Sequence, residues 1–279
     1  MHFPRRAERL TRDLDRLRRK AFAVPRSGAS RQPVPETSVK LAEVVGLDLD
    51  DWQGEYLESP SGRRILNICR QAGKSTVAAV SGLYDALVYP GSLVLIIAPS
   101  ERQSLETFRK VAGIYHRLGY VVPAHSERKL GMELLNGSRI EALPGSEKTT
   151  RGFSAPRRII ADEASRIPDE LYAGVLPMLA RSGGAFDLLS TPAGKAGFFY
   201  ETWTAGVWDS WEVPATEIPH RIPPEFLEEQ RRIMDERHYR QEFMCEFLDV
   251  EDAVFSEELI EQATGHDVAD TGGFAWEAS

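Results

Sequence analysis

The chain has 279 residues, which is enough for one large α/β domain or for one domain with appendages. Its content of 42% hydrophobic and 27% charged residues is ordinary for a soluble globular protein. Its formal net charge of −8 disfavours a protein that coats nucleic acid over its whole surface, but it does not exclude a local contact with DNA. No apolar run reaches the ~18 residues of a membrane span, and the charged N-terminus does not resemble a signal peptide. The six histidines and two cysteines lack the spacing of a zinc or redox site, and both cysteines are expected to be packed thiols.

Residues 1–36 are predicted to form a basic N-terminal helix and a linker. Arginine and lysine side chains cluster in residues 5–20, and three leucines lie on one side of the expected helix. This basic face is either a solvated surface or a contact for DNA or another anionic partner. Residues 25–35 are rich in proline and serine, which indicates the linker.

Residues 37–205 are predicted to form the core domain, because helical and strand patterns alternate along them. The segment 92–98 is almost wholly apolar, as expected for a parallel strand covered on both faces. Asn136-Gly137 marks the turn of a β-hairpin. The expected helices are 37–45, 51–57, 76–88, 101–118 and 169–179, and the expected strands are 63–69, 92–98, 132–135, 138–143, 158–163 and 186–190. This order predicts an α/β fold with a doubly wound, mainly parallel sheet.

Residues 206–255 are predicted to form a small C-terminal lid and linker, with helices at 224–234 and 239–247. Residues 256–279 are expected to be the start of a further domain or a tail.

The segment 67–75 resembles a phosphate-binding loop between a strand and a helix. It ends in Gly73-Lys74-Ser75, but the first glycine of the usual motif is replaced by Ile68. Backbone N–H groups at such a helix start surround an anion, and the lysine reaches the β- and γ-phosphates while the Ser75 hydroxyl ligates Mg²⁺. A Gly-Lys-Ser triplet also occurs by chance in ordinary loops. The residues expected to bind nucleotide here are Arg70, Gln71, Ala72, Gly73, Lys74, Ser75 and Thr76.

Asp162 and Glu163 end a short β-branched apolar run, and a helical segment is expected after them. Two carboxylates at a strand tip are costly unless a cation or solvent compensates them. The pair either caps the next helix or completes the triphosphatase site. Because it follows Lys74 in the chain order of such enzymes, we predict that Asp162 positions Mg²⁺ and Glu163 acts on the attacking water of ATP hydrolysis.

The joint order of these motifs resembles the N-terminal ATPase of the large terminase subunit of tailed bacteriophages, over roughly residues 45–260. Terminase phosphate loops often carry Arg-x-x-Gly-Lys-[Ser/Thr], as in residues 70–75. The resemblance also covers Trp52-Gln53 ahead of the loop, Arg151-Gly152 before the acidic strand, and Ser190-Thr191-Pro192 after it. It implies a RecA-like P-loop ATPase fold.

The resemblance implies a role for each of these residues. Gln53 would recognise adenine, unless Trp52-Gln53 is only a helix start with a core tryptophan. Arg70 would act in cis at the phosphates, and Arg151 would be a finger inserted into a neighbouring subunit's site, unless it pairs with Glu147 or solvent. Thr191 would couple hydrolysis to movement, unless Ser-Thr-Pro is only a turn.

The resemblance further implies an ATP- and Mg²⁺-dependent motor that moves double-stranded DNA into a procapsid in the cytoplasm of the infected bacterium. The implied partners are the portal protein and the small terminase subunit, and the implied assembly is a homo-oligomeric ring, a pentamer on the capsid, without a membrane. Past Val254-Phe255 the residues present are too few for an RNase H-like nuclease, so no DNA cleavage is expected. The alternatives are a DEAD-like helicase or translocase fragment and a nucleotide-gated scaffold that does not hydrolyse ATP.

Overall fold

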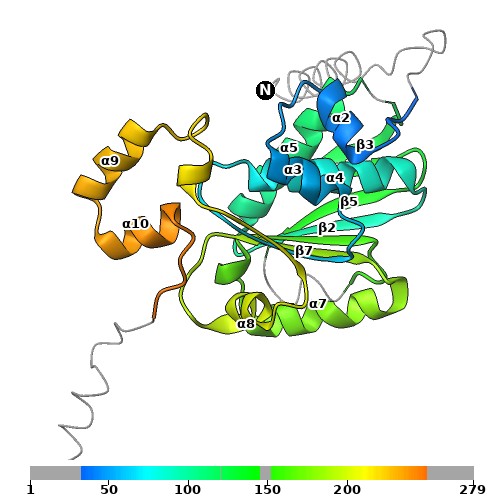
Figure 1. Cartoon of the computed structure of the whole chain (residues 1–279). Coiled ribbons are helices and arrows are strands. Elements are labelled where there is room, and N and C mark those ends of the chain that lie inside the picture. Colours follow the sequence, from blue (N-terminus) through cyan, green and yellow to red (C-terminus); the bar gives the residue numbers. More distant parts are fainter. Residues whose placement is uncertain (1–32, 120, 145–151, 250–279) are drawn as a thin grey trace, which may run out of the picture.

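A computed structural model describes residues 33–119, 121–144 and 152–249 of the chain. The expected basic helix, the loop with Arg151 and the end of the chain from residue 250 lie outside these residues. The described part is built around one eight-stranded sheet with helices on both faces (Figure 1). Each of its helices is too short or too polar to span a bilayer.

The sheet has the strand order β3-β4-β5-β2-β6-β7-β1-β8. In this order, the last six strands (β5, β2, β6, β7, β1 and β8) pair in parallel. β3 and β4 add an antiparallel edge. The expected mainly parallel sheet is therefore confirmed. The strands are β1 (Arg63–Ile68), β2 (Leu93–Ala98), β3 (Ala124–Arg128), β4 (Gly131–Leu134), β5 (Arg139–Pro144), β6 (Arg158–Asp162), β7 (Ala185–Ser190) and β8 (Asp209–Val213).

Two hydrophobic cores lie on opposite faces of this sheet, which is the doubly wound arrangement. Helices α2 to α5 cover one face, and α7 and α8 cover the other (Figure 1). The residues of β2 alternate between the two cores, which explains why its sequence is apolar throughout. The helices on the faces are α2 (Ser38–Val44), α3 (Asp51–Glu58), α4 (Lys74–Val88), α5 (Glu101–Arg117), α7 (Asp169–Ser182) and α8 (Gly197–Ala205).

A network of buried ion pairs joins the strands at their N-terminal edge. Asp187 on β7 is fully buried and accepts from Arg64 Nε at 2.6 Å and from Arg158 Nη1 at 2.7 Å. The Tyr56 hydroxyl donates to the same carboxylate at 3.0 Å. Removing one partner of such a network leaves an uncompensated buried charge, so these residues act as a unit.

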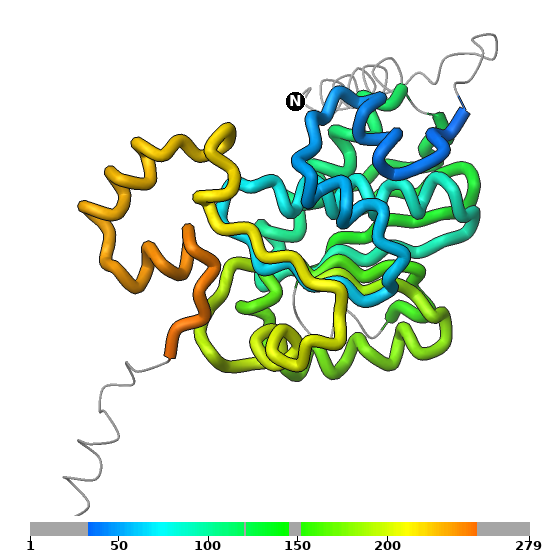
Figure 2. The backbone as a smooth tube through the Cα atoms, viewed as in Figure 1, coloured from blue at the N-terminus to red at the C-terminus, as the bar shows by residue number. Residues whose placement is uncertain are grey.

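Helices α9 (Pro224–Ile233) and α10 (Glu236–Phe243) form an arm beside the body of the molecule (Figure 2). The short 3₁₀ helix η2 (Ala215–Glu217) leads into it from β8. The arm is anchored because Leu227 and Cys245 belong to the core formed by α2 to α5. Both predicted C-terminal helices are present, although α10 begins and ends a few residues earlier than expected.

The structure adds three elements to those expected from the sequence. β3 extends the hairpin, α8 follows β7, and β8 pairs with β1 although it lies within the segment assigned to the lid. The core sheet therefore extends to Val213, while the division of the chain into domains remains a prediction. The helical segment expected after Glu163 is present as the short 3₁₀ helix η1 (Ala164–Arg166).

Candidate nucleotide-binding site

The loop between β1 and α4 has the backbone form of an anion-binding nest. Gln71 and Gly73 both have positive φ angles, of 66° and 91°, and α4 begins directly after Gly73. No described residue accepts a hydrogen bond from the backbone N–H groups of residues 71–75. Consecutive free N–H groups at the start of a 15-residue helix bind an anion such as phosphate.

Lys74 and Glu163 face each other at this sheet edge. The Lys74 ammonium lies 3.8 Å from Glu163 Oε1, and the Lys74 side chain is buried. β6, which carries Asp162 and leads into Glu163, lies two strands from β1 with β7 between them. The structure thus brings together the two charged residues that the sequence assigned to phosphate binding and to water activation.

Asp162 is buried at the tip of β6 and is fixed on both oxygens. Its Oδ2 accepts from the Thr107 hydroxyl of α5 at 2.5 Å, and its Oδ1 accepts from the Glu163 N–H at 3.1 Å. Thr107 was not predicted, and nothing in its local sequence marks it. Ser75 is also buried, at the first turn of α4. A hydroxyl and a carboxylate are oxygen donors of the kind that Mg²⁺ prefers, so this pair fits that ion.

Glu163 has a left-handed backbone conformation with φ 55° and ψ 42°. Its Oε2 accepts from Arg166 Nη1 at 3.0 Å, and the same nitrogen lies 3.3 Å from the Thr191 hydroxyl. Arg166 was not among the residues predicted from the sequence. Its position three residues after Glu163 could have indicated a contact between the two side chains, because residues three apart in a helical turn lie on the same side of the helix.

Gln53 lies against the phosphate loop from the side of α3. Its Nε2 donates to the Ala72 carbonyl at 3.1 Å, and its Oε1 accepts from the Asp50 N–H at 3.1 Å. Arg221, in the segment before α9, lies 3.3 Å from the same Oε1 and also donates to the Asp50 carboxylate. Burial raises the pKa of Asp50, but hydrogen bonds from Arg221 and His220 outweigh that effect and lower it.

Arg70 is exposed on the outer side of the loop, and its guanidinium pairs with Glu242 of α10. Glu242 also lies 3.4 Å from Arg166 Nη2, so one carboxylate of α10 contacts both arginines. A second contact of α10 runs from Gln241 Nε2 to the Pro192 carbonyl at 2.5 Å. Thr191 is fully buried at the tip of β7, beside Arg166. Arg166 thus contacts Thr191, Glu163 and Glu242, and it shares Glu242 with Arg70.

Two further features bear on the sequence predictions. Arg151 lies outside the described residues. Cys69 is buried beside the phosphate loop, and burial raises the pKa of its thiol to about 11, while burial also raises the pKa of the Cys245 thiol. Both cysteines therefore stay protonated and unreactive at neutral pH, as expected for packed thiols.

Comparison with known sequences agrees with the geometry of this site. The family model described as "Terminase large subunit, T4likevirus-type, N-terminal" matches residues 65–262. The chain is 27% identical over 264 residues to the terminase large subunit of Thermus virus P23-45, an alignment that covers 78% of this chain and 53% of that protein. The chain spans about half the length of the curated relatives it matches.

Solved structures have the same fold. The large terminase ATPase domain of Thermus phage P74-26 superposes with a TM-score of 0.68 at 23% identity, covering 78% of this chain and all of that one. The large terminase of another thermophilic bacteriophage, solved in complex with ADP, has a TM-score of 0.59 at 11% identity over 75% of this chain and 53% of its own. These likenesses confirm the RecA-like fold. Because the family model covers more than half of the chain, the chain belongs to the terminase large subunits, in the part that forms their N-terminal domain.

Proposed function

We propose that this chain hydrolyses ATP at the edge of the sheet where β1, β6 and β7 end. The observation that carries the proposal is the meeting of Lys74 and Glu163 beside the free backbone N–H groups of residues 71–75. Lys74 and these N–H groups bind the β- and γ-phosphates and oppose the negative charge that develops during phosphoryl transfer. Glu163 orients the attacking water and accepts its proton.

In this proposal Ser75 and Asp162 hold Mg²⁺. The ion neutralises phosphate charge when it is bound. Thr107 orients the Asp162 carboxylate through their hydrogen bond of 2.5 Å, as outer hydrogen-bond partners of metal ligands commonly do.

Gln53 is proposed to recognise the adenine of ATP. Its support is its position against Ala72 of the phosphate loop. The Gln53 amide already contacts Ala72 and Asp50, so adenine recognition uses the remaining amide proton or replaces one of these contacts. The resemblance to terminases favours this role, and one of the structurally similar large terminases was solved with ADP.

Arg70 and Arg151 are proposed to supply positive charge to the γ-phosphate, Arg70 in cis and Arg151 from a neighbouring subunit. In the described geometry Arg70 pairs with Glu242, so the cis role needs its guanidinium to exchange that carboxylate for phosphate. Thr191 is proposed to sense the phosphate through its hydroxyl, which contacts Arg166. We add Arg166 as a positioning residue, because it holds the carboxylate of Glu163.

The work done with this ATP is proposed to be translocation of double-stranded DNA into a viral procapsid, in the cytoplasm of the infected bacterium. Support comes from membership of the terminase large subunits. The same membership suggests the portal protein and the small terminase subunit as partners, and a homo-oligomeric ring, a pentamer on the capsid, as the assembly.

The test is the steady-state rate of ATP hydrolysis with and without linear duplex DNA. We expect DNA-stimulated turnover, a loss of ~10²-fold in Glu163→Gln with nucleotide binding retained, and a loss of binding itself in Lys74→Ala. Wild-type turnover in Glu163→Gln would refute the role given to Glu163. A chain that binds ATP and shows no turnover under any condition would favour the nucleotide-gated scaffold instead.

A DEAD-like helicase is disfavoured, because the family match is to terminases. The expectation that this chain does not cleave DNA still needs its own test. The described residues hold no group of three or more histidine, cysteine, aspartate or glutamate side chains that could share a metal ion. Incubation of supercoiled plasmid with the chain and Mn²⁺ is expected to leave the plasmid intact.

A further inference from the structure

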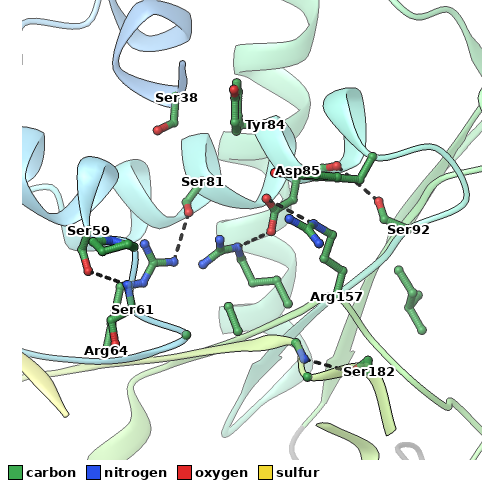
Figure 3. A pocket seen from close by; sticks show the side chains of 18 of the residues that line it. Ser38, Ser59, Ser61, Arg64, Ser81, Tyr84, Asp85, Ser92, Arg157 and Ser182 are labelled. Atoms are coloured by element: carbon green, nitrogen blue, oxygen red, sulfur yellow. Dashed lines mark hydrogen bonds and ion pairs between the residues drawn. The ribbon is translucent and has the colours of Figure 1, made fainter. Parts of the chain in front are cut away.

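A polar cavity of about 410 Å³ opens at the edge of the sheet opposite the nucleotide site. It lies where β1, β2, β6 and β7 begin and beside the second half of α4, which supplies Ser81, Tyr84 and Asp85. Figure 3 shows Arg64 and Arg157 reaching toward these α4 side chains from two sides of the cavity. A cavity with a polar lining holds water or a polar ligand.

The charged residues of the cavity leave one positive charge in excess. Three guanidiniums, of Arg64, Arg157 and Arg158, meet two carboxylates, of Asp85 and the adjoining Asp187 (3 − 2 = 1). Arg64 pairs with Asp187, and Arg158 bridges Asp187 and Asp85 through its Nη1 and Nε. Arg157 also forms an ion pair with Asp85, with its Nε 3.6 Å from Oδ1. Three guanidiniums therefore share two carboxylates, and one positive charge is left over in the cluster as a whole.

The Arg157 side chain makes the longest of these ion pairs and is 39% exposed. Its Nε is buried and makes no hydrogen bond, because the Asp85 Oδ1 oxygen with which it pairs lies 3.6 Å away. The guanidinium lies over the ring of Tyr89, 3.2 Å from its centroid. A buried donor without an acceptor is rare in folded proteins, and one cause is an ion that belongs at the site.

The backbone of Arg157 is fixed, and its guanidinium is placed by the Tyr89 ring and by Asp85, so the donor is partly preorganised. The Arg157 N–H donates to the Leu93 carbonyl at 2.8 Å, and its carbonyl accepts from the Ala185 N–H at 2.7 Å. Gly184 packs so closely that a Cβ there would lie 2.2 Å from the Pro156 carbonyl oxygen. A preorganised donor binds its ligand with less loss of conformational entropy than a mobile one.

We propose that this cavity binds a phosphate-type oxyanion through Arg157, the Nη2 of Arg158 and the hydroxyl of Ser81. The Nη2 of Arg158 has no acceptor among the described residues, and the Ser81 hydroxyl accepts from Arg64 at 3.3 Å and keeps its own proton to donate. A guanidinium offers a planar fork of donors that matches a phosphate bidentately. The phosphate group comes either from a free anion or from a nucleotide or nucleic acid. This site is separate from the ATP site and does not depend on the function proposed above.

The test is isothermal titration calorimetry of the full chain with inorganic phosphate. Lys74→Ala serves as the parent in every titration, so that phosphate binding at the nucleotide site is suppressed. The variants Arg157→Gln and Ser81→Ala are compared with Arg232→Gln, which removes an exposed arginine of α9 far from the cavity. Adenosine monophosphate and a short DNA duplex are titrated in parallel to distinguish the sources of the phosphate group. Thermal unfolding without ligand confirms that each variant is folded.

We expect Arg157→Gln to abolish binding, Ser81→Ala to weaken it about tenfold, and Arg232→Gln to leave it unchanged. Binding of inorganic phosphate that needs Arg157 supports a free anion as the ligand. Binding of only the nucleotide or the duplex, again dependent on Arg157, supports those sources. Equal affinity in the parent and in folded Arg157→Gln, or no binding of any probe to the parent, overturns the proposal.

Discussion

Glu163 lies between two cations, Lys74 on the phosphate loop and Arg166 on η1. The left-handed backbone at Glu163 aims its side chain back over the strand edge, toward Lys74. Such conformations in residues other than glycine cost free energy and cluster at functional sites. The geometry therefore agrees with Glu163 as the residue that acts on water, with Arg166 setting the direction of its carboxylate.

Arg166→Gln is expected to lower kcat for ATP hydrolysis by about tenfold and to leave KM nearly unchanged. The variant keeps Lys74 and the loop N–H groups that bind phosphate, but it releases the Glu163 carboxylate. Arg166→Lys should restore part of kcat, because it keeps the charge and loses only the fork geometry. Arg109→Gln, which removes an exposed arginine on α5, is the control. Equal loss in the lysine and glutamine variants would contradict a positioning role.

Gly73→Ala is expected to weaken nucleotide binding by about tenfold. The φ angle of Gly73 is 91°, and a Cβ there would lie 2.8 Å from Gln53 Nε2. Alanine in a left-handed conformation costs about 1–2 kcal/mol, and here the added methyl also displaces the glutamine that contacts Ala72. Binding of a fluorescent ATP analogue measures the change.

Gly46→Ala is the matched control for this substitution. Gly46 also has a positive φ, of 71°, but nothing lies within 4 Å of its added Cβ. It should lower thermal stability to a similar extent while leaving nucleotide affinity intact. A similar loss of affinity in both variants would mean that backbone strain acts through global stability rather than through the loop.

At the scale of elements, α10 is attached to the nucleotide site through a few polar contacts. Glu242 contacts Arg70 and Arg166, and Gln241 contacts the carbonyl of the proline that follows Thr191. In contrast, Tyr239 is the one buried residue among the eight of this helix. A helix with little buried area separates from the rest of the protein at a low free-energy cost. The position of α10 therefore depends on these polar contacts.

Glu242→Gln is expected to increase hydrogen exchange in residues 236–243 while exchange in β2 and β6 stays unchanged. The substitution removes both ion pairs between α10 and the site. Glu236→Gln, on the exposed first turn of the same helix, is the control. Unchanged exchange in α10 of Glu242→Gln would show that its apolar contacts alone hold it in place.

The elements that the sequence predicted are those with strong local signals. β2 was predictable from its apolar run, the β4–β5 turn from Asn136-Gly137, and α4 from the loop before it. β3 and β8 were missed because edge strands are partly exposed, and their sequences lack an apolar pattern. These two strands are defined instead by their partners in the sheet. β3 pairs with β4, and β8 pairs with β1, which lies far from it in the sequence.

The candidate site was predictable to the extent that its residues belong to local motifs. Lys74, Ser75, Asp162 and Glu163 were expected at one sheet edge, because parallel strands end there together, and the structure places them there. The contacts of Arg70 with Glu242 and of Asp162 with Thr107 were not predictable. They join segments 172 and 55 residues apart, and such pairs depend on tertiary packing rather than on local pattern.

At the scale of the whole molecule, α4 connects the two edges of the sheet. It begins with Lys74 at the nucleotide site and carries Ser81 and Asp85 into the cavity at the opposite edge. β6 runs in the same way from Arg158 to Asp162. The two polar regions are therefore joined by rigid, buried elements, although coupling between them needs a measured change at one site on binding at the other.

If Arg151 completes the site of a neighbouring subunit, as the resemblance to terminases implies, ATP hydrolysis depends on assembly. Turnover per subunit should then rise steeply with protein concentration, since a monomer lacks the arginine at its own site. An arginine supplied in trans stabilises transition-state charge and contributes about 10³–10⁵-fold to kcat in other phosphoryl-transfer enzymes. Turnover per subunit that stays constant on dilution would refute the trans role.

Mixing two inactive variants gives a sharper form of this test. In a mixture of Arg151→Ala and Glu163→Gln, some interfaces combine the intact Arg151 of one subunit with the intact Glu163 of the next, so activity should partly return. A mixture of Lys74→Ala and Glu163→Gln is the control, because every site then lacks one residue of its own and no interface can repair it. Recovery in the first mixture alone supports action between subunits. Equal recovery in both, or none in the first, contradicts it.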